Sequence, residues 1–230
     1  NKFNFIFAPD IHASVRDSRH GEGIKLMNKC QSISPMPIVT PGDIVNNYDK
    51  SEVVNGINQI IKKIGSNFLI AKGNHDDNSL KSKSVNDVIT EQELKKLFFD
   101  NMKPSGFDVT ISPDGMYYYA DDTVRKMRIV VLNTHENDYT IVGGNITEDT
   151  ASKGFINQKQ LEFIAKKALN IKVQKGDDYI NWHTIFMGHY PLNFAGTKAY
   201  GGETCENGTE MWKIIKAFKN GTSVTIAPTS

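Results

Sequence analysis

Short apolar runs alternate along this chain with longer stretches in which apolar residues recur every three or four positions. Apolar runs fill 3–8, 36–40 and 68–71, and the first ends in a polar loop, as buried strands do. Between the second and third runs lies a helical pattern that closes with Gly65 as a C-terminal cap. The apolar positions of that helix are Val53, Val54, Ile57, Ile60, Ile61 and Ile64. Strand, helix and strand in this order predict a βαβ unit.

The second half of the chain continues the alternation. Thr90 and Glu93 predict a capping box ahead of a helix, and Asn157 is placed to cap another. The segments 116–120 and 127–132 predict a hairpin whose turn is Asp121-Asp122, and 184–187 predicts one more buried strand. The last predicted helix carries four large apolar residues: Met211, Trp212, Ile215 and Phe218.

The whole chain, residues 1–230, is predicted to form a single α/β domain. Its length is enough for one sizeable core, and the polar stretches 78–88 and 136–154 are expected to be long loops within the domain. The run Tyr117-Tyr118-Tyr119 is typical of a strand that packs into a core.

The net charge and the cysteine content limit the kinds of partner that this chain is expected to bind. Lys and Arg number 27 against 26 for Asp and Glu, a net charge of +1, so strong nucleic-acid binding is not indicated and any such contact would be local. No apolar run approaches the roughly 20 residues of a membrane span, and no membrane partner is expected. Cys30 and Cys205 have no metal-ligand spacing and are interpreted as unrelated thiols, which leaves the compartment open.

Polar side chains follow four of the predicted strands, and strand ends are where ligands bind in α/β sheets. Carboxylate, imidazole and amide oxygen suit divalent ions such as Mn, Fe, Zn or Ni, and the lack of cysteine ligands argues against a structural zinc. Taken alone, Asp-Ile-His is typical of a polar loop and Gly-Asp of an ordinary turn. Gly-Asn-His-Asp is more specific, since an Asn-capped turn is almost the only other explanation besides a site. The residues concerned are Asp10, His12, Asp43, Asn74, His75, Asp76 and His189.

In this order and strand context the motifs Asp-x-His, Gly-Asp, Gly-Asn-His-Asp and Gly-His resemble those of the calcineurin-like metallophosphoesterases. The match spans nearly the whole chain. The resemblance implies a four-layer sandwich of two mixed β-sheets flanked by helices, a pair of divalent metal ions, and hydrolysis of a phosphomonoester or phosphodiester substrate.

The resemblance also implies a role for each residue. Asp10 and His12 would hold the first metal ion, and Asp43 would bridge both ions. Asn74 and His189 would hold the second ion. His75 would stand beside the phosphate and protonate the leaving oxygen, a task suited to an imidazole that titrates near neutral pH.

The physical logic of two metals agrees with these roles. Two ions roughly 3.5–4 Å apart can activate a hydroxide and clamp the phosphoryl oxygens, and a bridging carboxylate is needed to hold them. Gly42 leaves the backbone before Asp43 free to turn sharply, and Gly73 does the same before Asn74 and His75.

Two departures from the family pattern stand out. Asn46 takes the place of an Asp that orients the catalytic histidine in many members, and Asp76 or Asp49 would be the replacement; no Arg follows Asn46, which disfavours the Ser/Thr protein phosphatases. The closing Gly-His-x-His motif is also absent, since no histidine follows His189. Residues 217–222 and 223–226 resemble the helix and strand that lead to that motif, so we expect a truncated chain.

Other histidines are interpreted more plainly. His183 lies early in a strand and is expected to be structural. His20 and His135 lie in predicted loops, where a histidine is more often solvated than in contact with substrate.

Two functional classes stay open. The first is the metal-dependent phosphoesterase. The second is a catalytically weak module of the same fold that serves binding or structure, with a short likeness to phage proteins at its end. Converging carboxylates are costly to keep in a module that needs only the fold, which favours the enzyme.

Overall fold

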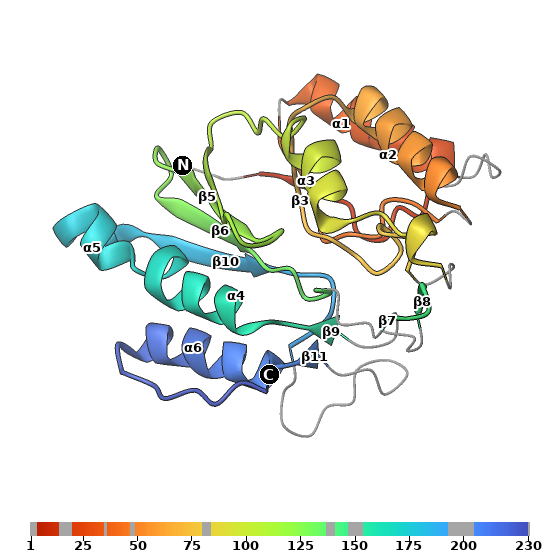
Figure 1. Cartoon of the computed structure of the whole chain (residues 1–230). Coiled ribbons are helices and arrows are strands. Elements are labelled where there is room, and N and C mark those ends of the chain that lie inside the picture. Colours follow the sequence, from red (N-terminus) through yellow and green to blue (C-terminus); the bar gives the residue numbers. More distant parts are fainter. Residues whose placement is uncertain are drawn as a thin grey trace.

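The structure is a computed structural model that describes residues 4–13, 20–34, 36–46, 49–79, 84–136, 141–146, 154–192 and 205–229. Its architecture is mixed α/β, with several sheets flanked by helices (Figure 1). None of the helices in these ranges is long and apolar enough to cross a membrane.

The first sheet contains the three parallel strands of the predicted βαβ region. β1 (Ile6–Phe7), β2 (Ile38–Thr40) and β3 (Phe68–Ile70) pair in the order β1-β2-β3. β2 and β3 are buried at every position, as their unbroken apolar runs predict. Because the three strands run in the same direction, their carboxyl ends meet at one edge of the sheet.

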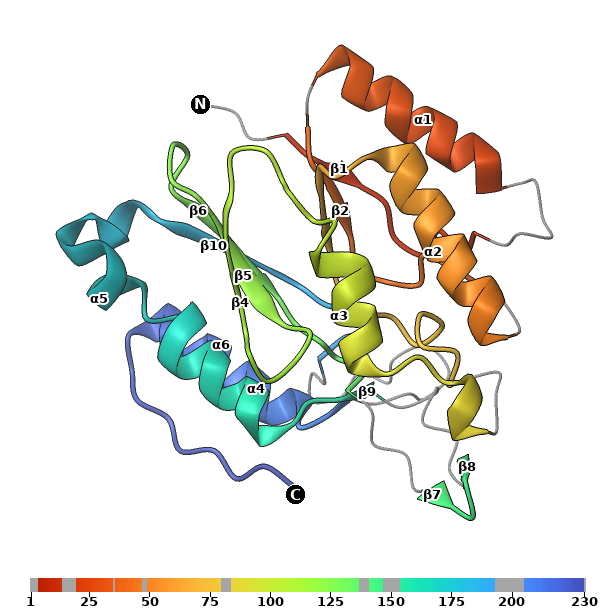
Figure 2. The same ribbon diagram turned by 45° about the horizontal axis from the view of Figure 1, so that its top comes forward.

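Two helices cover this sheet (Figure 2). α2 (Lys50–Ile64) begins at Asp49, whose side chain accepts the Glu52 N–H, and ends at Gly65, which takes φ 76° and donates to the Ile61 carbonyl. The Gly65 cap was predicted from the sequence, whereas the Asp49 cap was not. α1 (His20–Ile33) was not predicted, because its few buried apolar residues, such as Ile24 and Met27, are separated by Gly, Lys and Asn.

The second sheet is mixed. Its order is β10-β6-β5-β4, with β4 (Asp108–Ile111), β5 (Tyr118–Asp122) and β6 (Met127–Val131) antiparallel and β10 (His183–Met187) parallel to β6. β4 was not predicted, since three of its four side chains are exposed and leave no apolar pattern. Two small pairs complete the sheets: β7 (Ile141–Val142) with β8 (Asn145–Ile146), and β9 (Gly154–Phe155) with β11 (Cys205–Glu206).

The predicted hairpin exists, but its turn was misplaced. Asp121 and Asp122 belong to strand β5, and the turn is formed by residues 123–126. Asp121 pairs across the ladder with Arg128, and its carboxylate accepts the guanidinium Nε at 2.6 Å in a buried ion pair. Two adjacent acidic residues indicate a turn only when solvent, rather than a buried cation, is their partner.

Two of the remaining helices begin at the caps that the sequence predicts. α3 (Glu91–Phe99) starts with the complete Thr90/Glu93 capping box, and α4 (Gln158–Phe163) starts at Asn157. A π-helical turn, η3 (Ile164–Ala168), continues α4. The other helical segments are η1 (Val85–Asp87), α5 (Ile171–Lys175), η4 (Gly176–Asn181) and α6 (Gly208–Asn220).

The strand predicted at 223–226 is wrong. Gly221 ends α6 in the left-handed conformation, and residues 222–229 have no strand pairing. The backbone amide of Ala227 donates to Glu210, and that of Thr229 donates to Asn207. These side chains at the start of α6 take the hydrogen bonds that a neighbouring strand would have received.

The core consists of two clusters on opposite faces of the second sheet. Ile129 and Val131 of β6 pack with the first sheet and α1–α3, whereas Val130 pairs with the apolar residues of α4 and α6. Figure 1 shows this order, with α1 and α2 on one side and α4 and α6 on the other. Tyr117 and Tyr118 are fully buried, as predicted for core packing.

Candidate metal centre

The predicted ligand residues lie on the loops that follow β1, β2, β3 and β10. The loops after β1 and β2 run side by side, since the His12 amide donates to the Asp43 carbonyl at 2.8 Å and the Ala13 amide to the Ile44 carbonyl at 2.9 Å. Parallel pairing of the strands therefore continues into the loops and places Asp10, His12 and Asp43 at one edge of the sheet.

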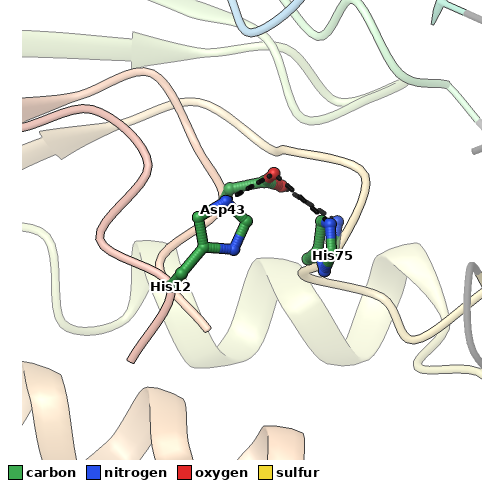
Figure 3. Close-up of side chains that lie close together, drawn as sticks. All are labelled: His12, Asp43 and His75. Atoms are coloured by element: carbon green, nitrogen blue, oxygen red, sulfur yellow. Dashed lines mark hydrogen bonds and ion pairs between the residues drawn. The ribbon is translucent and has the colours of Figure 1, made fainter. Parts of the chain in front are cut away.

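Three histidines surround a single carboxylate oxygen. Oδ2 of Asp43 lies 3.4 Å from Nε2 of His189, 3.6 Å from Nε2 of His12 and 3.9 Å from Nε2 of His75. Figure 3 shows His12 and His75 beside the Asp43 carboxylate, and their rings meet edge to face at 4.7 Å. The Asp43 side chain is buried, so all three imidazoles approach it from the remaining open side.

Asn74 and Asp10 complete the group. Oδ1 of Asn74 lies 2.8 Å from Nε2 of His189, and Oδ1 of Asp10 lies 3.9 Å from Nε2 of His12. Donor atoms of His12, Asp43 and His75 lie within 4.8 Å of one another, and so do those of Asp10, Asp43 and His189. The structure thus brings together the six residues to which the resemblance gives a role, and Asp43 is common to both sets.

Three of these residues have an uncommon backbone conformation. Asp10, His12 and Asp43 take φ values of 49°, 45° and 52°. A left-handed conformation at a non-glycine residue is uncommon, costs free energy, and clusters at functional sites. The strain turns each side chain toward the same point.

Two glycines allow the loops to touch. A β-carbon on Gly42, which has φ 111°, would lie 2.4 Å from the Gly73 amide nitrogen, and one on Gly73 would lie 2.3 Å from the Asp43 amide nitrogen. Only hydrogen fits at either α-carbon, so the glycines let the Asp43 loop and the Asn74-His75 loop approach closely.

Asp76 holds the two loops in this arrangement. Its carboxylate accepts the backbone amides of Asp43 and Ile44, at 3.0 Å each, and of Gly73 at 2.8 Å. Burial, together with the nearby Asp43 charge, raises the pKa of Asp76 to about 7.

The replacement suggested for the missing orienting Asp takes a different form. Asp49 caps α2, and the hydrogen bonds described for Asp76 go to backbone amides. The Asn46 amide donates to the Ala13 carbonyl and so joins the β1 and β2 loops. The hydrogen bonds of Asp76 and of the Asn46 amide therefore join the loops that carry the candidate ligands.

Asp43 and His189 stabilise each other's charged forms. Burial alone would raise the pKa of Asp43, but its hydrogen bond and attraction to His189 hold that pKa below the usual value. Burial alone would lower the pKa of His189, and the Asp43 carboxylate raises it. A cation beside Asp43 is therefore favoured electrostatically.

The donor set fits divalent cations. Ligand distances of about 2.0–2.2 Å place two donors on one ion roughly 3–3.5 Å apart, close to the separations around Asp43 Oδ2. Imidazole nitrogen, carboxylate oxygen and amide oxygen together suit first-row ions. In the described part of the chain, the groups that could hold such ions are His12, Asp43 and His75, and Asp10, Asp43 and His189, with the Asn74 amide oxygen beside His189.

The prediction for His135 was wrong, because its side chain is buried rather than solvated. It lies beyond β6 with 1% exposure, and burial lowers its pKa to about 4. His183 begins β10 with an exposed side chain, and the His20 side chain lies outside the described residues.

Sequence reasoning missed a buried polar group behind the centre. Lys72 and Asp77 form an ion pair of 2.6 Å with no exposure, and Glu136 is buried with its pKa raised by burial to about 8. The only sequence signal was that Lys72 and Asp77 flank the Gly-Asn-His-Asp motif, which is not enough to distinguish them from surface charges.

Comparison with known proteins identifies the family. The family model described as calcineurin-like phosphoesterase matches residues 3–223. The chain belongs to the calcineurin-like phosphoesterase family. Metal-dependent hydrolysis of phosphoesters is the general activity that this family supports.

Solved structures agree on the fold of this calcineurin-like phosphoesterase. The crystal structure of a dimetal phosphatase from Danio rerio superimposes with a TM-score of 0.59 at 12% identity, over 94% of this chain and 77% of that one. At this identity the likeness shows the fold alone. A search of the curated proteins gave no match.

Proposed function

We propose that this protein hydrolyses phosphomonoesters or phosphodiesters at a centre of two divalent metal ions. The observation that supports this proposal is the position of Asp43. Its buried carboxylate has an Oδ2 that lies within 4 Å of three imidazole nitrogens from three different loops. A structural cluster of this kind would keep one histidine as an ion-pair partner and has no need of three. A bridging ligand between two ions accounts for the arrangement.

In this proposal Asp10 and His12 hold one ion and Asn74 and His189 hold the other. Asp43 is shared by both. The 2.8 Å contact between Asn74 Oδ1 and His189 Nε2 supports the assignment of these two donors to the same ion. When bound, the two ions would supply positive charge for the phosphoryl oxygens and lower the pKa of a coordinated water.

His75 is proposed as the general acid. Its Nε2 is the most distant of the three from Asp43 Oδ2, at 3.9 Å. The Asp43 Oδ1 accepts the His75 backbone amide at 2.9 Å, which fixes the residue without using its ring as a ligand. The ring can therefore give a proton to the leaving oxygen of a bound ester.

A binding or structural module of the same fold is the second candidate. It is favoured by one observation, namely that each ion has three protein ligands among the residues named. Such a module would bind ions without turnover.

Turnover of an aryl phosphodiester and an aryl phosphomonoester, with and without added Mn²⁺, separates the two candidates. We expect hydrolysis that requires the ion and stops with excess chelator. Hydrolysis that persists in chelator would exclude the two-metal mechanism. Tight Mn²⁺ binding with no turnover of either ester would favour the module.

A further inference from the structure

A buried ion pair closes the base of the loop that carries Asn74 and His75. Lys72 precedes this loop and Asp77 follows it, and their side chains meet at 2.6 Å with no exposure at either residue. Asp77 also accepts the backbone amide and the hydroxyl of Ser79 at 2.9 and 2.7 Å. The two ends of the loop are thereby held together.

The same lysine reaches the second sheet. Its Nζ donates to the backbone carbonyl of His135 at 3.0 Å. One residue earlier, the hydroxyl of Thr134 accepts the backbone amide of Tyr190 at 2.7 Å. Tyr190 follows His189 directly, so buried polar contacts join the loop after β3 to the loop after β10.

The two loops meet at the metal centre. Nε2 of His189 and Oδ1 of Asn74 lie 2.8 Å apart there. We infer that Lys72, Asp77 and Thr134 are positioning residues that set the separation of Asn74 and His189, and with it the geometry of one metal site. This inference rests on the proposed function.

Energetics favour positioning over stability as the role of the pair. A buried ion pair must offset the desolvation of both charges, and replacing such pairs by well-packed apolar residues of similar volume is often neutral for folding. Its contacts are directional, however, and fix two backbone segments at once. Partners that orient ligands in this way typically change metal affinity by 10- to 100-fold when they are lost.

The test uses the double variant Lys72→Met/Asp77→Asn, which removes both charges and keeps the acceptor for Ser79. We expect the variant to fold with a lower unfolding midpoint, because the His135 carbonyl loses its Lys72 donor. Mn²⁺ affinity should fall by about 10- to 100-fold, and the visible spectrum of bound Co²⁺ should change. Arg128→Met is the matched control. It breaks a buried ion pair at the opposite end of β6 and leaves Asp121 paired with Lys175 at 2.8 Å, so stability should fall while Mn²⁺ affinity stays unchanged.

Thr134 gives a second test should the double variant not fold. Thr134→Val lacks the acceptor for the Tyr190 amide and should lower Mn²⁺ affinity, whereas Thr134→Ser keeps that acceptor and should retain it. A folded double variant, or a folded Thr134→Val variant, with wild-type Mn²⁺ affinity and Co²⁺ spectrum would overturn the inference.

A metal-free measurement separates this inference from the proposed function. The ¹⁵N signals of the His189 ring and the Asn74 side-chain amide report their contact in the absence of any ion. We expect both signals to shift in the double variant and in Thr134→Val. Unchanged signals would refute the positioning role, whereas a wild-type protein that binds no Mn²⁺ would refute the proposed function.

Discussion

A β-carbon at Gly73 would stand 2.1 Å from Oδ1 of Asp43, so the proposed bridging ligand packs directly against a glycine of the neighbouring loop. This contact explains why two short motifs far apart in the chain form one centre. The position of the Asp43 carboxylate depends on the absence of a side chain at Gly73 as much as on its own hydrogen bonds.

Gly73→Ala should therefore damage the centre. The added methyl group must push the Asp43 loop away, which we expect to cost about 1–3 kcal/mol of stability and most of the Mn²⁺ affinity. Gly23→Ala is the matched control, because a β-carbon at this helical position meets nothing within 4 Å. Denaturant unfolding and Mn²⁺ titration measure both effects, and normal Mn²⁺ binding by Gly73→Ala would show that the loops can separate without harm.

The variants Asp43→Asn and His75→Ala should distinguish the proposed metal ligand from the proposed general acid. Asp43→Asn removes the charge shared by both ions and is expected to lose bound metal together with activity. His75→Ala should keep the number of bound ions and lose about 100-fold or more in turnover, as expected when a general acid is removed. Metal content and kcat are measured on the same samples. Equal metal content in the two variants would contradict the bridging role of Asp43.

Tyr118→Phe should loosen the contact between the two sheets. The Tyr118 hydroxyl accepts the Ile70 amide at 2.8 Å and donates to the Ile70 carbonyl at 2.9 Å, and burial raises its pKa. Without the hydroxyl, the Ile70 amide and carbonyl lose this buried hydrogen-bond partner. The free energy of unfolding should fall by about 1–3 kcal/mol. Urea unfolding measures the difference. Tyr179→Phe, at a partly exposed position, should change stability by less than about 0.5 kcal/mol.

Glu136 should make the protein less stable at alkaline pH. Burial raises its pKa from 4.5 to about 8, so the folded state binds more protons than the unfolded state between these values. Stability from this group is complete below about pH 4.5 and is lost as pH rises through about 8. The slope is up to about 1.4 kcal/mol per pH unit.

The measurement compares wild type and Glu136→Gln by denaturant unfolding from pH 6.5 to 9. This range avoids His135, whose lowered pKa gives the opposite dependence below about pH 6.5. Glu136→Gln should flatten the alkaline decline, and Glu22→Gln, at an exposed position, should leave it unchanged. A decline of equal slope in Glu136→Gln would place its origin in another group.

The sequence by itself determined the elements whose signals are local. The helix from Lys50 to Ile64 was predicted with its C-terminal cap Gly65, and the helix starts at Thr90 and Asn157 were predicted too, because capping depends on residues three or four positions apart. It also placed the motif residues at strand ends, since an apolar run followed by a glycine and a polar residue has few other meanings. The convergence of the ends of β1, β2 and β3 follows from their parallel pairing, whereas His189 comes from β10 of the second sheet.

The tertiary structure decided what depends on partners distant in the chain. Asp121 lies within a strand because Arg128 neutralises it there, and the segment after Gly221 forms no strand because Glu210 and Asn207 bind its amides. His135 is buried although its sequence neighbours are polar. In each case the hydrogen bonds or charges of a distant segment outweigh the local pattern, and no local pattern contains them.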